Sequence, residues 1–416
     1  MKRQKAALAC QRFEGTHSYD RIMNIFQDIF SKYEINRDKI TSVVTDNGSN
    51  FTKAFRVFGY DNVYEDDEDQ DECDIDFISL EELTLPKHNR CMSHTLSLVA
   101  TTDIKTALKN KSFAEMNATV MEKCSKLWRK NNRPKSSELI HKTLNHHLRI
   151  PCVTRWNSMY DAVTQLSNEP ELTKLQEILD LPTFTNEEII FLKEYSTVLK
   201  PIAEGIDRLQ ADDIPYSHVL PTLLTIRNKL SEIKDLQFGG CLHEAIYNGF
   251  NKRFSSYLTI DKTIKSAYIA TMVDPLFKLR WLKLLACQTT DTIKELKRSL
   301  INICTENKDI EASPQPCSSK VDDYFNLDEN PQDLTIEAQV ATYLSDTDTS
   351  LSCLDKYPTI KKVFRKYNVS LPSSAAVERL FSLSSMIDSP RRKKTTDTLF
   401  ENLILLKINT HYIEDN

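Results

Sequence analysis

A short run of β-branched residues, 40–45 (ITSVVT), lies between two helical patterns and limits the folds open to this chain. Before it, residues 17–35 carry apolar side chains at the helical period, which predicts an amphipathic helix. After it come an Asn-Gly turn and a second helical pattern at 51–58, for which Ser49 or Asn50 is the expected N-cap. Helix, strand, turn and helix in this order predict an α/β unit with a parallel strand.

The bulk composition favours a helix-rich protein of several domains. The chain has 416 residues, which suggests two or three domains, and only 7 glycines, which argues against many tight β turns. No apolar run is long enough to cross a bilayer, so no membrane contact is expected. The 10 cysteines include no Cys-x-x-Cys pair, so we expect reduced thiols and no structural zinc finger.

The net charge of −5 comes from one segment. Residues 65–76 (EDDEDQDECDID) hold nine acidic residues and no basic one, so the rest of the chain has a charge of +4. Such a block is typical of a solvated, disordered loop, with an electrostatic interaction segment as the alternative. The mildly basic remainder is compatible with nucleic acid.

Further patterns divide the chain. Residues 6–13 resemble a strand, and residues 90–100 resemble a helix. From 159 to 305 the pattern is helical, and it includes a capping box formed by Thr185 and Glu188. Residues 306–334 are polar, contain prolines and lack a period, which predicts a linker. Residues 399–408 are apolar nearly all round, so this helix should be buried in the core or against a partner.

Two carboxylates stand out although they lie 332 positions apart. Asp46 ends the β-branched run, and Glu378 lies in a helical pattern near the C-terminus. A carboxylate at a strand tip and another on a distant helix suit a divalent-metal nuclease site, which needs at least one more carboxylate. The alternatives are ordinary: Asp46 as a turn residue, and Glu378 as a helix-surface acid paired with a base.

Five segments, in order, resemble hAT-superfamily transposases, which include domesticated host-encoded relatives that often carry BED-type zinc fingers. The resemblance covers about residues 6–411 and is most specific in the last segment. The segments are VTDNGSNFTKAF (44–55), CMSHTLSLV (91–99), TRWNSMYDAV (154–163), IATMVDPLFKLRWL (269–282) and LPSSAAVERLFSLSSMIDSPRR (371–392).

This resemblance implies an α/β fold with a ribonuclease-H-like core, incomplete at its N-terminus and interrupted by a large helical insertion. Residues 1–158 would form the first part of that core, and residues 159–305 the insertion. After the linker, residues 335–416 would complete the core and carry the dimerisation region.

The family also implies roles for individual residues. Asp46 and Glu378 match the second aspartate and the glutamate of an Asp-Asp-Glu set that holds two Mg²⁺ or Mn²⁺ ions for DNA strand cleavage and transfer. Cys91 and His94 match a Cys-x-x-His motif close to the active site, with a packed cysteine and a hydrogen-bonded histidine as the alternative. Trp156 matches a tryptophan that stacks on an extruded base; a core or interface anchor is the alternative.

The sequence departs from the family at the first aspartate. Asp20 and Asp28 lie in a helical pattern rather than at a strand end, and neither replaces it. The BED finger is also not found. We therefore expect an inactive metal site, with Asp46 and Glu378 as vestigial ligands and no required cofactor. An active or fragmentary transposase, using Mg²⁺ or Mn²⁺, is the competing hypothesis.

The remaining expectations concern partners. Besides Cys91, His94 and Trp156, the candidate DNA contacts are Arg155, Arg391 and Arg392. The basic run 391–394 is also a weak nuclear-localisation signal or solvated surface. Leu399, Leu403 and Leu406 are candidate dimerisation residues. The predicted function is that of a nuclear, hAT-transposase-derived homodimer that associates with DNA and has no small-molecule substrate. A regulatory scaffold without DNA contact, or a cytoplasmic location, is the alternative.

Overall fold

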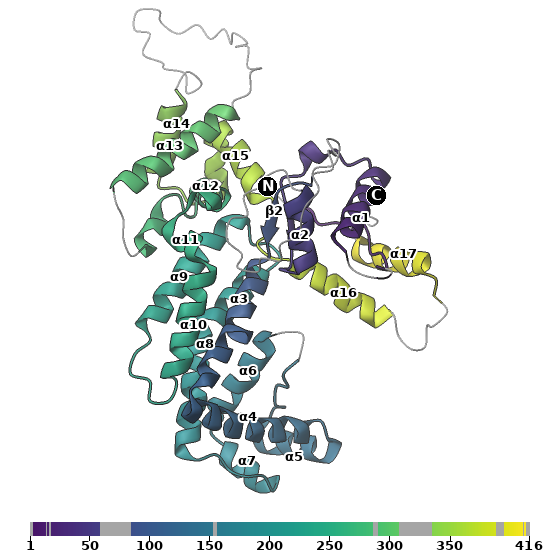
Figure 1. Ribbon diagram of the computed structural model, residues 1–416, viewed down its shortest axis with the longest axis vertical. Helices are drawn as coiled ribbons and strands as arrows, with labels where there is room; N and C mark the ends of the chain where they lie inside the picture. Colours follow the sequence, from purple (N-terminus) through teal and green to yellow (C-terminus); the bar gives the residue numbers. More distant parts are fainter. Residues whose placement is uncertain are drawn as a thin grey trace, which may run out of the picture.

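The protein is mostly helical, and its described strands form one small parallel pair. The computed structural model describes residues 3–13, 15, 18–58, 85–152, 156–285, 290–307, 335–387, 395–410 and 412. Among these residues the structure contains α-helices, short 3₁₀ helices (labelled η) and the strands β1 and β2. Figure 1 shows a long helical bundle with a smaller α/β unit beside it.

The α/β unit is built from the first elements of the chain. In order, these are α1 (Tyr19–Lys32), η1 (Arg37–Lys39), β1 (Val43–Thr45), α2 (Ser49–Phe58) and β2 (His88–Arg90). The strands run parallel, with Val44 opposite Asn89. A separate hydrophobic cluster forms between α1 and α2 and includes Ile22, Met23 and Phe55. The predicted helix, strand and helix are therefore present in the predicted order.

The local differences from prediction have simple causes. Strand β1 covers only the last three of residues 40–45, because its partner β2 is equally short. Helix α2 begins at Ser49, so Ser49 and Asn50 lie in its first turn, and neither is the N-cap. The strand expected at 6–13 is wrong: residues 3–13 have no regular secondary structure, and their backbone bonds to side chains of the C-terminal helix.

The described elements from Met92 to Glu306 are helices, and they form the bundle. Its long central helix begins at the predicted capping box, in which Thr185 accepts from the Glu188 backbone and Glu188 accepts from the Thr185 backbone. The elements are α3 (Met92–Thr101), η2 (Asp103–Lys109), α4 (Lys111–Asn131), α5 (Pro134–Leu144), α6 (Trp156–Ser167), α7 (Leu172–Ile178), α8 (Asn186–Gln210), η3 (Tyr216–His218), α9 (Val219–Glu232), α10 (Gly240–Arg253), α11 (Ser255–Thr259), η4 (Lys262–Ile264), α12 (Lys265–Met272), η5 (Arg280–Leu284) and α13 (Thr290–Glu306).

The next helices extend the same bundle. They are α14 (Ile336–Ser345), η6 (Leu351–Lys356) and α15 (Pro358–Asn368), which lie at the upper end in Figure 1. Val340, Tyr343 and Ile360 belong to the hydrophobic core that also contains the buried residues of α3 to α13. The predicted linker, 306–334, lies almost wholly outside the described residues, as does the acidic segment 65–76.

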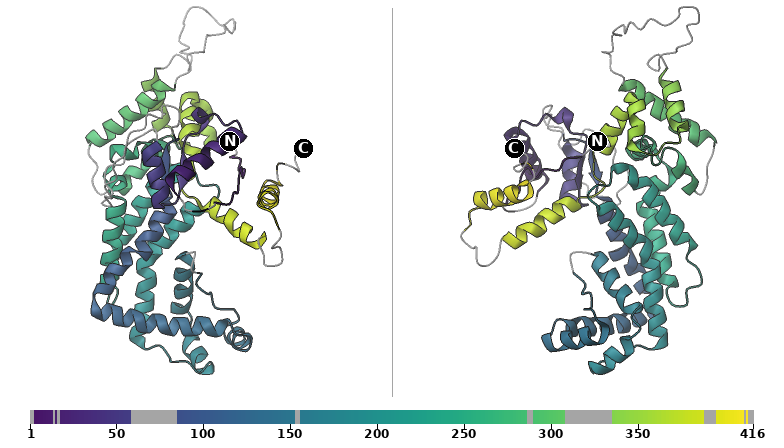
Figure 2. Two further views of the ribbon diagram at one scale, coloured as in Figure 1. Left: turned by 45° about the vertical axis from the view of Figure 1, so that its right-hand side comes forward. Right: turned by 180° about the vertical axis from the view of Figure 1, so that it is seen from behind.

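The last two helices leave the bundle. Helices α16 (Ala375–Ile387) and α17 (Asp397–Ile408) contact each other and project beside the α/β unit, as both views of Figure 2 show. Asn409, just after α17, donates to the Ala7 oxygen at 2.8 Å and accepts from the Ala7 nitrogen at 2.9 Å. Residue 7, near the start of the described chain, is thus joined to residue 409, near its end. None of the described helices has both the length and the apolar character that a membrane crossing requires.

Candidate functional site

The tip of β1 presents Asp46 at the surface. Asp46 is exposed, and its Oδ1 accepts from the Gly48 nitrogen at 3.1 Å, the pattern of an Asx turn. Asp46 therefore acts as a turn residue, and one of its carboxylate oxygens accepts the hydrogen bond of that turn.

The imidazole of His88 braces this tip from β2. Thr45 Oγ1 donates to the backbone carbonyl oxygen of Asp46 at 2.8 Å and lies 2.8 Å from His88 Nε2. Because a hydroxyl carries one hydrogen, His88 Nε2 must be the donor to Thr45. Burial first, and then the charge of Arg90, lower the pKa of His88 to about 4, so the ring is neutral near neutral pH. It stacks on Phe55 with ring centroids 4.4 Å apart.

The N-terminus of α3 lies directly against the strand tip. The Cys91 nitrogen donates to the Thr45 oxygen at 2.8 Å, and Asn47 Nδ2 donates to Thr95 Oγ1 at 3.0 Å. Cys91 is the N-cap of α3, and its sulfur accepts from the His94 nitrogen at 3.4 Å. The predicted Cys91–His94 pair thus shapes the start of a helix, with the sulfur buried.

The start of α16 reaches the same place from the far end of the chain. The Met92 nitrogen donates to the Pro372 oxygen at 3.0 Å, and the Ser374 nitrogen donates to the Cys91 sulfur at 3.3 Å. Glu378 lies one helical turn beyond Ser374 and is exposed. The segments that carry Asp46, Cys91 and Glu378 therefore meet, and we call this meeting point the junction.

Further contacts fix α16 to the bundle at the junction. Ser373 Oγ donates to the Leu209 oxygen at 2.9 Å, and Arg379 Nη1 donates to the Gln210 oxygen at 3.3 Å. Arg379 also forms an ion pair with Asp212. The C-terminal end of α8 thus holds the first turn of α16 in place.

The donor atoms at the junction do not fit a two-ion centre. Within the described part of the chain, no three or more His, Cys, Asp or Glu side chains are placed to hold a metal ion. Asp46 uses one oxygen in its own turn, and the Cys91 sulfur accepts two backbone N–H groups. Two bridged ions need several shared carboxylate oxygens, so we derive no catalytic step through a metal here.

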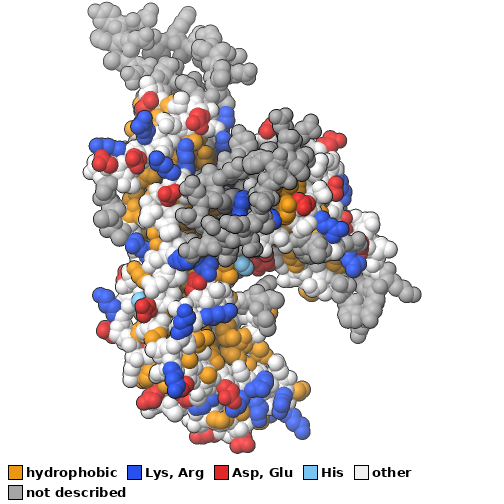
Figure 3. Space-filling view, in the orientation of Figure 1, with side chains coloured by type: hydrophobic (Ala, Val, Ile, Leu, Met, Phe, Trp, Pro, Cys, Tyr) orange, Lys and Arg blue, Asp and Glu red, His pale blue; other side chains and the backbone are white. Residues whose placement is uncertain are grey.

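A second candidate face lies on the lower bundle. Trp156 is the first residue of α6, is half-buried, and stacks with Tyr160 at a centroid distance of 6.3 Å. Hydrophobic side chains gather over α6 and Lys and Arg side chains over α5 on one face of the molecule (Figure 3). The exposed bases of α5 include Lys135 and Lys142. Trp156 also packs against the main core, so both the anchor and the stacking interpretation stay open.

Three candidate DNA contacts are not covered by the structure. Arg155, Arg391 and Arg392 lie outside the described residues. Their roles stay predictions.

The C-terminal helices expose apolar side chains. Leu399 is 51% exposed and Leu406 is 56% exposed, while Leu403 is half-buried. In the described part of α17 only Ile404 is buried, so this apolar helix is not buried in the core of its own chain. The expectation that residues 399–408 form a partner interface stays a prediction.

Residues on α16 that the sequence analysis did not single out extend this exposed surface. Phe381 is 58% exposed and Met386 is 75% exposed, and Val377 is exposed as well. We call Val377, Phe381, Met386, Leu399 and Leu406 the hairpin surface. The signal for the α16 members was their apolar character on a helix that also carries Glu378, Arg379 and several serines.

No family model matches this chain, and no curated protein matches it either.

Proposed function

We propose that this chain is a hAT-transposase-derived protein that acts as a homodimer in the nucleus, associates with DNA and does not cleave it. Its fold would be a ribonuclease-H-like core interrupted by the helical bundle. The observation that carries the proposal is the junction, where the tip of β1, the start of α3 and the start of α16 are joined by backbone hydrogen bonds.

The junction supports this proposal because it brings into contact two segments that lie before and after most of the helical bundle in the sequence. More than 280 positions of sequence separate Cys91 from Ser374, yet the sulfur and nitrogen lie 3.3 Å apart. Closing such a long loop costs conformational entropy. We therefore infer that the two segments belong to one structural unit. Asp46, at the strand tip, and Glu378, on the helix, both belong to this unit. They are the two positions that match carboxylates of the family's Asp-Asp-Glu set.

The donor set supports the absence of cleavage. A metal-dependent nuclease needs carboxylate oxygens shared between ions about 4 Å apart. Among the described residues, Asp46 and Glu378 do not belong to any group of three His, Cys, Asp or Glu side chains placed to hold a metal ion, and the nearby Asp212 pairs with Arg379.

The hairpin surface supports self-association. Large exposed apolar side chains are candidates for interaction sites, because their contact with water is unfavourable. Phe381, Met386, Leu399 and Leu406 lie on two helices that contact each other, and each is more than half exposed. A second copy of the same surface is the simplest occupant, since two-fold contacts use one patch twice.

Sedimentation velocity tests the dimer. We expect the wild-type chain to be dimeric at micromolar concentration and the double variant Phe381→Asp, Leu406→Asp to be monomeric with unchanged helicity. Leu351→Asp is the matched control, because Leu351 is 47% exposed but lies on η6, within the bundle. A monomeric wild type, or a dimer that survives the double variant, would reject the hairpin surface as the interface.

DNA association rests on the face that carries α5 and α6. The face carries an aromatic pair on α6, Trp156 and Tyr160, and exposed lysines on α5; bases can stack on rings, and cations can neutralise phosphates. In a mobility-shift assay we expect binding that weakens as salt rises, and weaker binding by Trp156→Ala and by Lys135→Gln with Lys142→Gln. Binding that is absent at low salt would favour a scaffold without DNA contact.

A further inference from the structure

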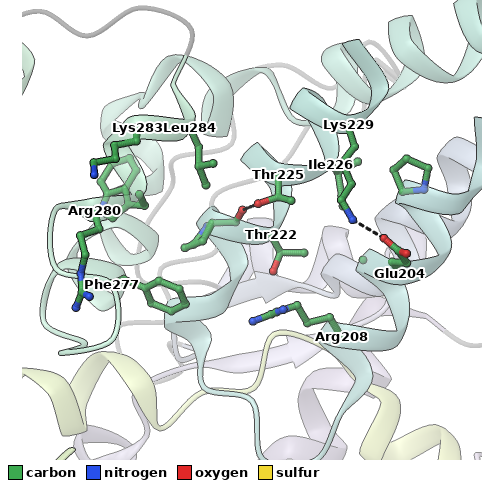
Figure 4. A pocket seen from close by; sticks show the side chains of 14 residues that line it. Glu204, Arg208, Thr222, Thr225, Ile226, Lys229, Phe277, Arg280, Lys283 and Leu284 are labelled. Atoms are coloured by element: carbon green, nitrogen blue, oxygen red, sulfur yellow. Dashed lines mark hydrogen bonds and ion pairs between the residues drawn. The ribbon is translucent and has the colours of Figure 1, made fainter. Parts of the chain in front are cut away.

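A groove lies on the bundle, between α8 and α9 on one side and η5 on the other. Its volume is about 580 Å³, within the range of pockets that hold small ligands. Figure 4 shows its side chains converging from these elements. We call it the α8–α9 groove; it is lined by Pro201, Glu204, Gly205, Arg208, Pro221, Thr222, Thr225, Ile226, Lys229, Phe277, Arg280, Trp281, Lys283 and Leu284.

The floor of the groove is apolar and tightly built. Gly205 lets α9 approach α8 closely: a Cβ there would lie 2.4 Å from Ile226 Cδ1. Ile226 and Trp281 are buried, each with 2% of its surface exposed. Phe277 and Leu284, also in the lining, are half-buried, so part of the apolar lining stays open to an organic group.

The rim of the groove is positively charged. Four cations and one carboxylate line it, a net charge of +3. Lys229 and Glu204 neutralise each other at 2.6 Å on one wall. Arg208 and Lys283 have no hydrogen-bond or ion-pair partner among the described residues. Two positive charges are therefore available to an anionic ligand.

Arg208 extends from α8 into the groove. In Figure 4 its guanidinium extends past Thr222 toward Phe277. Burial first, and then the charge of Arg208, lower the pKa of His218 to about 4. His218 packs edge-on against Phe277, with ring centroids 4.9 Å apart. His218 and Phe277 therefore lie close to Arg208 on this side of the groove.

Two polar groups of the lining lack a partner. Thr222 is 7% exposed, and its hydroxyl makes no hydrogen bond within the described part of the chain. The indole Nε1 of Trp281 is fully buried and also has no partner there. The buried indole N–H of Trp281 costs free energy while it has no acceptor. The Thr222 hydroxyl is not among the buried atoms without a partner, so it is open to solvent and to a ligand. The hydroxyl of Thr222 lies beside Arg208 (Figure 4), so one ligand group could bond to both.

We propose that the α8–α9 groove binds a nucleoside phosphate, with its phosphate on Arg208 and Thr222 and its planar base over the apolar floor. A phosphate monoester carries a charge of about −1.5 to −2 near neutral pH and several acceptor oxygens, which matches two free cations and a free hydroxyl. The proline and aromatic side chains of the lining suit a flat ring. The nucleotide is either free or one unit of a strand.

Equilibrium binding to the full chain tests this proposal. The probes are AMP, ribose 5-phosphate, adenosine and a short single-stranded oligonucleotide. We expect saturable binding of AMP, and binding at least tenfold weaker for ribose 5-phosphate and for adenosine. Oligonucleotide binding without AMP binding, lost in the variants below, would assign the groove to a strand.

Variants separate this site from the rest of the surface. Arg208→Gln and Thr222→Val should each weaken binding at least tenfold, with thermal unfolding unchanged. Lys193→Gln is the matched control, because Lys193 is exposed on the same helix and does not line the groove. No binding of AMP or oligonucleotide, or binding that Arg208→Gln leaves intact, would overturn the proposal. The site does not depend on the proposed dimer, whose variants lie on α16 and α17.

Discussion

The buried ion pair between Lys123 and Glu188 offers the sharpest test of how the bundle is held together. Glu188 lies in the first turn of α8 with 7% of its side chain exposed, and the Lys123 side chain on α4 is 16% exposed. Lys123 Nζ donates to the two carboxylate oxygens at 2.8 and 2.6 Å. Glu188 also closes the capping box by accepting from the Thr185 nitrogen at 2.7 Å.

Replacing Glu188 with alanine removes both functions. Loss of a capping interaction costs about 1 kcal/mol. Leaving one charge of a buried pair without its partner costs about 3–5 kcal/mol. Lys123 would keep only its bond to the Thr183 oxygen at 2.9 Å. Because the two effects share one carboxylate, we expect Glu188→Ala to lower the free energy of unfolding by about 3–5 kcal/mol in total.

Urea unfolding followed by far-UV circular dichroism measures this change. Glu187→Ala is the matched control, because Glu187 is the neighbouring acid in the same turn but is exposed. Its effect should stay within about 0.5 kcal/mol. A double-mutant cycle with Lys123→Met should give a coupling free energy of about 2 kcal/mol or more. Equal effects of Glu188→Ala and Glu187→Ala would refute the reasoning.

Two further predictions concern the α/β unit and the chain ends. Because the pKa of His88 falls from 6.5 to about 4 on folding, the unfolded state binds more protons between these values, and acidification through this window destabilises the fold. Between about pH 7 and pH 4.5, the free energy of unfolding should fall by about 2 kcal/mol less in His88→Gln than in the wild type, as measured by urea unfolding at the two pH values. An equal fall in both proteins would contradict this. Asn409→Ala should free residues 3–13 and speed proteolysis there, while Asn402→Ala should not; equal cleavage rates would show that the two bonds to Ala7 do not hold this segment.

The parts of the fold that depend on local patterns could be predicted. The amphipathic stripe predicted α1, and the capping box at Thr185 and Glu188 predicted where α8 begins, because neighbouring residues supply both signals. Strand β2 could not be predicted in this way. It reads His-Asn-Arg and is a strand only because β1 bonds to it.

The errors came from interactions between distant segments. Residues 6–13 resemble a strand, yet their backbone bonds to Asn409 and Glu401 rather than to a sheet. The α8–α9 groove left no signal in the sequence, because its walls come from two separate segments, 201–229 and 277–284. The exposed side of α17 could not be distinguished from a buried one, because apolar residues surround the helix on all sides.

The junction was partly predictable. The resemblance singled out Asp46, Cys91 and Glu378, and the structure brings their segments together through Thr45, Cys91 and Ser374. The structure shows how α3 and α16 are joined: the Cys91 sulfur accepts a hydrogen bond from a backbone N–H of α3 and another from the start of α16. Such a double acceptor cannot be read from a Cys-x-x-His spacing.

Divalent-metal-dependent cleavage of hairpin-forming DNA is the most direct test of the central claim that the junction is an inherited site without catalysis. The assay compares the wild-type chain with Asp46→Ala and with Glu378→Ala, in Mg²⁺ and in Mn²⁺. We predict no cleavage by the wild type above the level of the two variants. Cleavage by the wild type that disappears in Asp46→Ala would contradict the account and identify the junction as an active nuclease site.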